Sequence, residues 1–467
     1  MRRVNFITVF WGETYRRRFL DLCLSSLCSA SSLEAVDRSA GHRFVILCGL
    51  SDWEAISSHP LVVLLGQHFE VVWLELRMPM PDWLGDLWRR EGSRICGYVT
   101  DEPSADDFLY GTRLDQLCTL ADNDPASEPV DRYKLVIYGM SRGHLKALDF
   151  IGRNGGGASF LAPDMVLNAG AMRIVIGQVK RDVSLVVAAA NRFTYSAVED
   201  LKIHGYLQAG APSDLPAREL VHYCFSNPHP ETRAFEFERP DFCQVPTCMS
   251  FRLPHDGGVV MHSMFWAPLY IAEDVLERVD RPLLARGGTV DGRFLAEALD
   301  LEADRIHVVQ DSDELFLASF TEAETYGYPE VSAWYKKQPP LSTLYKSVSV
   351  HVSLYGPNGD ALKRYLYRHP IVFHAGNATP LWRRVLQRAE KNAARATGQL
   401  GFFGHLILPF VLLTRPDRAN LRLTDYGLFR AGRVFRISGE GLVAKLAWGL
   451  RNPRQAISVV RRKWSAA

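Results

Sequence analysis

The residues best suited to chemistry surround Asp164, where a single carboxylate interrupts a stretch of apolar residues. The run reads Phe160-Leu-Ala-Pro-Asp164-Met-Val-Leu-Asn-Ala-Gly170-Ala-Met172. An apolar run that ends at an acidic residue, followed by more apolar residues and a glycine, is typical of a buried strand that delivers a carboxylate to the rim of an α/β sheet. A carboxylate at that rim could hold a metal ion, a ribose hydroxyl or a reacting sugar. The structural alternative is that Asp164 caps the helix expected after it.

Two other predicted strand ends carry side chains that could belong to a site. The buried strand predicted over residues 4–10 ends at Trp11 and Gly12. The strand predicted over residues 182–190 is followed by Arg192, whose guanidinium could neutralise a diphosphate. The structural alternatives are a tight turn beside a core aromatic ring for the first pair, and a salt bridge for Arg192.

Three more acidic residues are candidates for catalysis. Asp291 precedes a glycine in a predicted turn. Asp311 and Asp313 are two positions apart, so on an extended chain both face one side and could hold a cation. The same run, Asp-Ser-Asp-Glu, is also typical of the start of a helix. By contrast, His262 lies in an apolar run and is expected to be a core histidine.

A possible serine nucleophile lies in residues 139–143, Gly-Met-Ser-Arg-Gly. This run matches the Gly-x-Ser-x-Gly pattern of serine hydrolases, in which the serine occupies a strained turn between a strand and a helix. Periodicity favours another structure, because apolar residues recur at helical spacing from 133 to 151 without a break at Ser141. We therefore expect Ser141 to lie inside a helix.

The elements that must position these residues are strands alternating with helices. Their order predicts an α/β fold with a mostly parallel sheet covered by helices on both faces. With 467 residues, of which 47% are hydrophobic, the chain can bury a large core in two domains. The eight cysteines lack the spacing of a zinc site, so reduced core thiols are expected. No signal peptide or bilayer-spanning run is expected, and residues 401–414, the most apolar stretch, should be buried or interfacial.

Charge is distributed unevenly along the chain. Residues 381–467 contain 17 Lys/Arg and 4 Asp/Glu, a net charge of +13, which leaves −11 for residues 1–380 because the whole chain carries +2. A basic tail on an acidic body predicts an anionic partner for the tail. Aromatic residues do not alternate with Lys/Arg as they do in nucleic-acid modules, so we expect a membrane surface rather than a nucleic acid. The structural alternative is that the tail pairs with the acidic body.

Residues 1–200 resemble the bacterial GT-A-like glycosyltransferases. The resemblance rests on Val9-Phe-Trp-Gly-Glu-Thr-Tyr15, on the run from Phe160 to Met172, and on their separation. It implies a Rossmann-like, GT-A-type sheet that binds a nucleotide sugar at its carboxyl edge, with Trp11 and Gly12 at the end of the first strand bordering the base. It also implies an Asp-x-Asp motif that holds Mn²⁺ or Mg²⁺ on the donor's diphosphate, but Ala162 replaces the first Asp here.

The incomplete motif leaves three possibilities open. The transfer could be independent of metal, a metal could be held by Asp164 together with Asp313 or Asp311, or the activity could be lost. The resemblance further implies that residues 1–340 form the catalytic domain, with a nucleotide-binding half over 1–200 and an acceptor half over 201–340. Residues 341–467 are then a basic, mostly helical region.

The sequence thus predicts a cytoplasmic glycosyltransferase, peripheral at the inner face of the membrane, that moves a sugar from a nucleotide-sugar donor to a glycan, lipid-linked or protein acceptor. In this prediction Asp291, Asp311 and Asp313 are the catalytic candidates. The first alternative is an α/β hydrolase in which Ser141 works with Asp291 and with His307 or His374. The second alternative is a scaffold that keeps the fold without the activity.

Overall fold

The computed structural model describes residues 3–76, 132–279, 305–323 and 343–398, with short gaps at 241, 244–245, 254–256, 265, 356–360 and 378. It also describes isolated positions between 281 and 290 and between 403 and 411. The catalytic candidate Asp291 lies outside the described residues.

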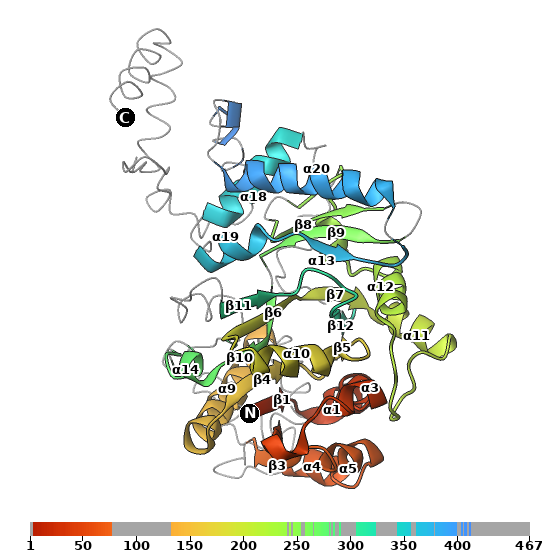
Figure 1. The fold of residues 1–467 in the computed structure, drawn as a ribbon, viewed down its shortest axis with the longest axis vertical. Helices are drawn as coiled ribbons and strands as arrows, with labels where there is room; N and C mark the ends of the chain where they lie inside the picture. Colours follow the sequence, from red (N-terminus) through yellow and green to blue (C-terminus); the bar gives the residue numbers. More distant parts are fainter. Residues whose placement is uncertain are drawn as a thin grey trace, which may run out of the picture.

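A seven-stranded sheet forms the centre of the molecule, in the order β11-β6-β10-β4-β1-β2-β3 (Figure 1). Every strand is parallel to the others except β10, which is antiparallel to both of its neighbours. This arrangement confirms the predicted fold class, a Rossmann-like and mostly parallel sheet of the GT-A type. The strands are β1 (Val4–Val9), β2 (Arg43–Cys48), β3 (Glu70–Glu75), β4 (Gly157–Leu161), β6 (Leu185–Ala189), β10 (Trp266–Ile271) and β11 (Ile306–Val308).

Helices cover both faces of this sheet (Figure 1). The chain runs outward from β1 to β3 and then returns to β4, so right-handed crossovers place the connecting helices on opposite faces. Helix α9 (Arg132–Asn154), which links β3 to β4, packs on β1 and β2, and α14 (Glu273–Leu276) lies on the same side. The other face is covered by α1 (Gly12–Arg18), a π-helical turn (Phe19–Leu24), α2 (Ser25–Leu27), α3 (Ala30–Leu33), a 3₁₀ turn (Arg38–Ala40), α4 (Leu50–Ile56), α5 (Pro60–Gly66) and α10 (Ala171–Lys180).

Ser141 lies inside α9, as the periodicity predicts, and not on a turn. Its two flanking glycines are required by packing, because α9 crosses the end of β1 at very close range. A Cβ atom on Gly143 would overlap the side chain of Val9, and one on Gly139 would lie 2.6 Å from the ring of Trp11. The Gly-x-Ser-x-Gly pattern is therefore a helix-packing pattern here.

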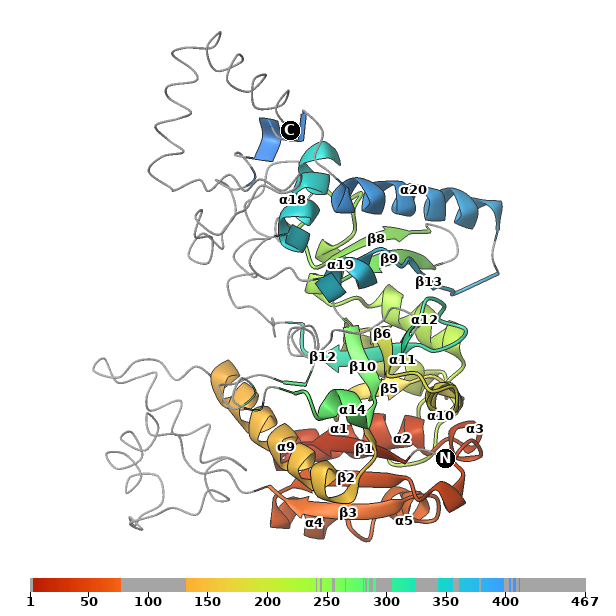
Figure 2. The same ribbon diagram turned by 60° about the vertical axis from the view of Figure 1, so that its left-hand side comes forward.

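Two smaller sheets continue from the central one. The first, in the order β5-β12-β7, lies beside the carboxyl edge and comprises β5 (Met165–Leu167), β12 (Leu317–Thr321) and β7 (Asn191–Thr194), with α11 (Tyr195–Ile203), α12 (Ala217–Ser226) and α13 (Pro230–Ala234) around it. The second, β13-β9-β8, comprises β13 (Ile371–Phe373), β9 (Val259–Ser263) and β8 (Cys248–Arg252), and is covered by α18 (Thr343–Tyr355), α19 (Ala361–Tyr367) and α20 (Pro380–Thr397) (Figure 2).

Two element boundaries differ from those predicted. The strand that leads to Asp164 begins at Gly157 rather than Phe160, because it pairs with β1 from Val4 onward. The apolar run over 259–266, which the sequence alone indicates is one strand, is two strands in two different sheets, β9 and β10, separated by a bend. Pro268 lies inside β10, next to a register shift in its pairing with β6, where a proline is tolerated.

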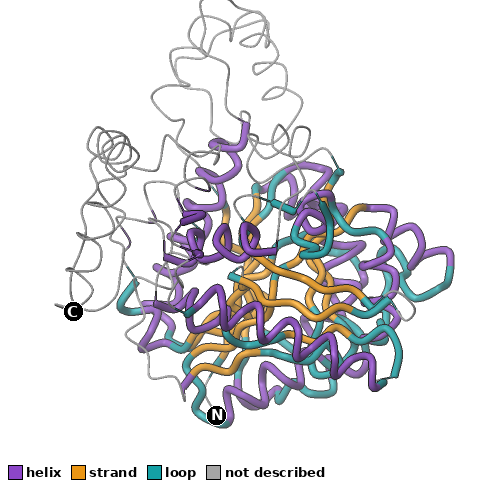
Figure 3. The backbone as a smooth tube through the Cα atoms, turned by 90° about the horizontal axis from the view of Figure 1, so that it is seen from above, coloured by secondary structure: helices purple, strands orange, loops and turns teal. Residues whose placement is uncertain are grey.

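The tube view in Figure 3 shows the central strands between helices, as expected for a buried parallel sheet. All six described cysteines are buried thiols, which agrees with the predicted core thiols. His262 is fully buried and shares a 2.8 Å hydrogen bond with the carbonyl oxygen of Tyr367, so it is a core histidine as predicted. Within the described chain, no helix is both long and apolar enough to cross a membrane.

Candidate functional site

Asp164 lies in the turn between β4 and β5, at the carboxyl edge of the central sheet. Its main-chain carbonyl accepts a 3.2 Å hydrogen bond from the amide of Phe320, which ties the turn to β12. A strand follows Asp164 rather than a helix, so this carboxylate is not a helix cap. The parallel register of β1 and β4 pairs Thr8 with Leu161, so Trp11 and Asp164 both lie three residues beyond a paired position on adjacent strands.

Two arginines are close enough to Asp164 to act on its charge. Burial raises the pKa of the Asp164 carboxyl above its ordinary value, and the guanidinium groups of Arg18 and Arg192 oppose that rise. Each arginine is held by another carboxylate, Arg18 by Glu322 at 2.9 Å and Arg192 by Glu231 at 3.3 Å. Among the described residues, no side chain hydrogen-bonds to the Asp164 carboxylate, and the two arginines act on it through their charge alone. The arrangement presents fixed positive charge around a carboxylate with free acceptor capacity.

Two tyrosines lie beside the same arginine. The guanidinium carbon of Arg18 is 5.1 Å from the ring centre of Tyr15 and 4.6 Å from that of Tyr195. Burial and the nearby Asp164 carboxylate raise the pKa of Tyr15, and burial raises that of Tyr195, so both phenols stay protonated at neutral pH. The Tyr195 hydroxyl is buried and has no hydrogen-bond partner among the described residues. It is therefore an unused donor at this site.

The turn after β1 is fixed by a carboxylate from the neighbouring crossover. Gly12 has a positive φ of 76° and donates its amide to Asp52 at 2.9 Å. Arg16 donates to the second oxygen of Asp52, also at 2.9 Å. Trp11 packs against α9 at Gly139, and its ring centre lies 6.5 Å from that of Tyr15. Trp11 and Gly12, the pair predicted to border a nucleotide, are thus held in place by packing and hydrogen bonding. They lie at the same edge of the central sheet as Asp164.

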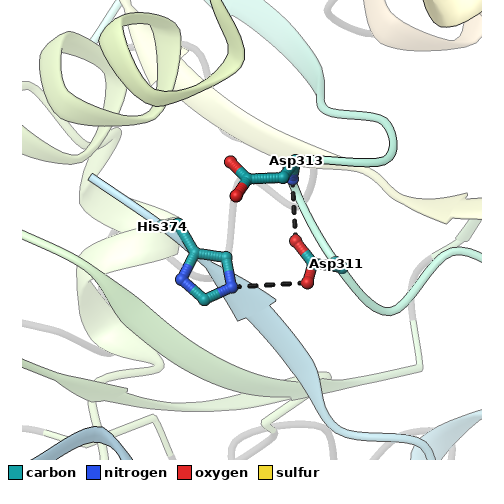
Figure 4. A group of neighbouring side chains, drawn as sticks. All are labelled: Asp311, Asp313 and His374. Carbon is teal, nitrogen blue, oxygen red and sulfur yellow. Dashed lines mark hydrogen bonds and ion pairs between the residues drawn. The ribbon is translucent and has the colours of Figure 1, made fainter. Parts of the chain in front are cut away.

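Asp311 and Asp313 form a separate group with His374, drawn in Figure 4. One ligand atom from each residue lies within 4.8 Å of the others. His374 is 3.4 Å from Asp311, and the Asp313 amide donates to the Asp311 carboxylate at 2.8 Å. Arg218 makes two close contacts with Asp313, at 2.9 and 3.1 Å, and its hydrogen bonds lower the pKa of that carboxyl. The Arg218 guanidinium therefore already gives Asp313 the positive charge that a bound metal ion would give it.

The structure does not bring together the metal pair predicted from the sequence. Asp164 is bonded to one end of β12 through Phe320, whereas Asp313 precedes the other end, so at least about 10 Å of strand separates them. The group shown in Figure 4 is also the only cluster of three potential metal ligands among the described residues. Asp164 can offer a cation a single carboxylate ligand. Such a site suits an ion that takes its remaining ligands from water and phosphate.

The residues of a serine hydrolase are not assembled in the described chain. Ser141 is buried in α9 and donates to the carbonyl oxygen of Leu284 at 2.5 Å. His307 lies on β11 and is hydrogen-bonded to Glu314 at 2.7 Å. His374 is paired with Asp311, as described above. Ser141 lies inside a helix and donates to a main-chain carbonyl, so it is not placed as a nucleophile beside a histidine base.

A polar cavity of about 330 Å³ opens beside β11. Its walls carry hydrogen-bonding groups of several kinds together with one tyrosine ring. They are formed by Ile306, His307, Val308, Gln310, Asp311, Glu314, Tyr365 and His369. Carboxylates, imidazoles, an amide and a phenol together suit a ligand rich in hydroxyl groups.

The reasoning from sequence identified Asp164, Arg192, Trp11 and Gly12 but missed the other polar groups around Asp164. Tyr15 and Arg18 follow Trp11 by four and seven positions, which is the spacing of residues on one face of a helix. Tyr15 is the last residue of the run from Val9 to Tyr15, and Arg18 comes three positions after it. Tyr195 and Glu322 come from distant parts of the chain and give no local signal. The polar residues near Asp164 that the sequence did not predict are therefore Tyr15, Arg18, Tyr195 and Glu322.

Comparison with known proteins gives limited similarity. No family model and no curated protein sequence matches the chain. Among solved structures, mouse xyloside xylosyltransferase 1 in its apo form aligns with a TM-score of 0.21 and 9% identity, over 46% of this chain and 63% of that protein. Residues 1–349 of Staphylococcus aureus TarS align with a TM-score of 0.31 and 10% identity, over 90% of this chain and 87% of the other. A longer TarS structure aligns at the same TM-score and identity, over 94% and 59%. With TM-scores this low, the fold assignment depends on the chain's own strand order.

Proposed function

We propose that this protein is a glycosyltransferase that moves a sugar from a nucleotide-sugar donor to a glycan, lipid-linked or protein acceptor. The observation that carries the proposal is the convergence of Asp164, Arg18 and Arg192 at the carboxyl edge of a Rossmann-like sheet. In open α/β sheets, ligands bind in the crevice outside this edge. Fixed guanidiniums beside a carboxylate are the groups that a sugar diphosphate needs there.

In this proposal the two arginines bind the donor's diphosphate. As the bond between sugar and phosphate breaks, negative charge grows on the leaving group, and preorganised guanidiniums stabilise it. Asp164 accepts hydrogen bonds from sugar or ribose hydroxyls, and the unused Tyr195 hydroxyl donates to the same ligand. Trp11 and Gly12 border the base. An Mn²⁺ or Mg²⁺ ion would take Asp164 and the donor's phosphates as ligands and would supply additional positive charge.

The proposed acceptor side lies at the end of β11. Asp311 follows that strand, is half exposed and has His374 beside it, so it is our candidate to accept the proton of the acceptor hydroxyl. β11 is separated from β4 by two strands, which corresponds to about 14 Å along the sheet edge. The polar cavity beside β11 suits an acceptor sugar. Asp313 is committed to Arg218, and Asp291 stays a catalytic candidate.

Donor binding tests the proposal directly. We expect one class of nucleotide diphosphate sugar to raise the melting temperature of the protein in a screen made with and without Mn²⁺. Arg18→Ala should then weaken the binding of that donor by about 10- to 100-fold, because it removes charge-assisted hydrogen bonds. The matched control is Arg17→Ala, since Arg17 is highly exposed and pairs only weakly with Glu13 among the described residues.

The expected result for the control is unchanged donor affinity. If Arg17→Ala and Arg18→Ala weaken binding equally, or if no nucleotide sugar binds, the site is not a donor site. A scaffold without activity is the second candidate, favoured by Ala162 in place of the motif's first Asp. Donor binding without release of nucleotide, tested over the glycan and lipid-linked acceptors, would identify the scaffold.

A further inference from the structure

The described residues from Thr343 onward form a basic layer at one end of the molecule, which we call the C-terminal layer. They contain nine Lys/Arg and one acidic residue, Glu390. Helices α18 and α20 and the turns of residues 403–411 lie at the end opposite β3, α4 and α5 (Figures 1 and 2). Residues 1–380 carry a net charge of −11 and residues 381–467 one of +13, so the excess positive charge of the chain lies in its C-terminal part.

Helix α20 carries its cations along one exposed stripe. Arg384, Arg388, Lys391 and Arg395 are spaced by four, three and four residues, so they lie on one side of the helix, and all four are exposed. The buried residues of α20 face β8 and β9. The stripe is therefore fixed in orientation by the packing of the opposite side.

Most of these cations are not neutralised by the acidic body. Arg388 forms an ion pair with Glu238. Arg384, Lys391 and Arg395 form no ion pair with any described residue. The pairing of the tail with the body, considered as the structural alternative, is thus limited to one cation of the stripe in the described chain. The other three are available to an external anion.

Exposed apolar side chains gather in the same layer. The described chain has seven exposed large hydrophobic side chains, and four of them, Leu344, Leu381, Phe403 and Leu406, belong to the C-terminal layer. Phe403 and Leu406 are 69% and 53% exposed, while Leu408 and Val411 are buried against α18. The packing of Leu408 and Val411 against α18 therefore holds Phe403 and Leu406 at the surface.

We propose that the C-terminal layer docks the protein on an anionic lipid surface. Lys/Arg side chains near such a surface are attracted to its headgroups, and exposed Leu and Phe side chains insert at the level between headgroups and acyl chains. A surface that binds only a polyanion in water has no use for exposed leucines, whereas a bilayer uses both features. This docking is independent of the proposed transferase activity, and its test needs no substrate.

Vesicle flotation of the full-length protein tests the proposal. Wild type should float with vesicles that contain phosphatidylglycerol at low salt, should not float with pure phosphatidylcholine, and should be released as salt rises. The triple variant Arg384→Glu, Lys391→Glu, Arg395→Glu should lose binding by at least about 100-fold, since three attractive charges become repulsive. The matched control is Arg173→Glu, Lys180→Glu, Arg181→Glu, which changes the net charge equally at exposed positions of α10 and the turn after it.

The control variant should float like wild type, and Leu381→Ser with Leu406→Ser should weaken binding that persists at intermediate salt. Equal loss in both triple variants would show a net-charge effect and would overturn the docking surface. So would unchanged binding in the first triple variant, equal binding to both kinds of vesicle, or no binding to either. Binding of a DNA duplex by the layer without binding of vesicles would identify a nucleic-acid surface instead and would also overturn the proposal.

Discussion

Asp164 is a carboxylate whose environment works against its charge, and this has a measurable effect on stability. Burial raises its pKa, so between the unfolded and folded values the native protein holds a proton that the unfolded chain has released. Stability should therefore fall as pH rises through that window. We expect Asp164→Asn to have a higher free energy of unfolding than wild type at pH 7, with the difference disappearing at pH values below the ordinary carboxyl pKa of about 3.9. Urea denaturation at several pH values measures this.

Asp313 provides a control of opposite sign for that prediction. The hydrogen bond from Arg218 lowers the pKa of Asp313, so its contribution to stability is present above the unfolded pKa and is lost as pH falls through the folded one. Asp313→Asn should thus be less stable than wild type at pH 7. If both variants shift stability in the same direction at pH 7, the opposite environments of the two carboxyls are disproved.

Tyr195 should separate ligand binding from stability. Its buried hydroxyl has no described partner, so Tyr195→Phe should leave the free energy of unfolding unchanged or raise it by about 1–2 kcal/mol, since an unsatisfied group is removed. If the hydroxyl donates to the nucleotide-sugar ligand, the same change should weaken donor affinity by about 5- to 10-fold. Calorimetric titration together with denaturation checks both. A variant that is less stable and binds normally would show that the hydroxyl has a structural partner.

The site could be predicted from sequence only in part. Asp164 and Arg192 could be predicted as candidates because each follows a recognisable apolar strand, and strand ends share one edge of a parallel sheet. Arg18 was missed because an arginine in a basic helix is ordinarily on a solvated surface. Its position in the structure is set by contacts with Glu322 and Tyr195, which are distant in sequence. Tertiary neighbours of this kind decide whether a charged residue lies on a solvated surface or beside a buried group.

Helix α9 offers a test at the level of one element. Gly139→Ala or Gly143→Ala would force a methyl group into Trp11 or Val9, and we expect a loss of about 1–3 kcal/mol of stability. Gly152 is the matched control, since a Cβ there would meet only an arginine nitrogen of Arg281 at 3.6 Å. Gly152→Ala should stabilise the helix by up to about 1 kcal/mol. Chemical denaturation distinguishes the two classes, and destabilisation by all three changes would remove packing as the cause.

Element prediction succeeded where hydrophobic periodicity was long. The strand predicted over residues 43–48 has the observed bounds of β2, and the stripe over 133–151 lies within α9. The failures are short or compound elements. β5 and β13 have three residues each, too few for a periodic signal, and the run over 259–266 is apolar on both sides of a bend that divides β9 from β10.

At the scale of the whole molecule, the chain links its sheets at two places. β9 and β10 belong to different sheets but are separated by only two residues. The loop after β11 is bonded to β13, with Ser312 donating to Val372 at 2.9 Å and Val372 donating to Gln310 at 2.8 Å. β13 in turn belongs to the sheet of β8 and β9, so the predicted division at residue 340 does not fall between sheets. These links should transmit unfolding from one end to the other.

Trp382→Ala tests that coupling. Trp382 is buried in the hydrophobic core between α20 and the sheet of β8 and β9, where it fills the space beside Gly258, and its ring centre lies 5.1 Å from that of His374. Removing it should cost about 3–5 kcal/mol, because a large cavity remains in a rigid core. Since the sheets are linked, we expect calorimetry to show one transition at a lower temperature, with unfolding of the central sheet in that same transition. Leu381→Ala, at the exposed neighbouring position, should leave the melting temperature nearly unchanged. Two separated transitions in Trp382→Ala would show instead that the C-terminal layer and its sheet unfold independently of the central sheet.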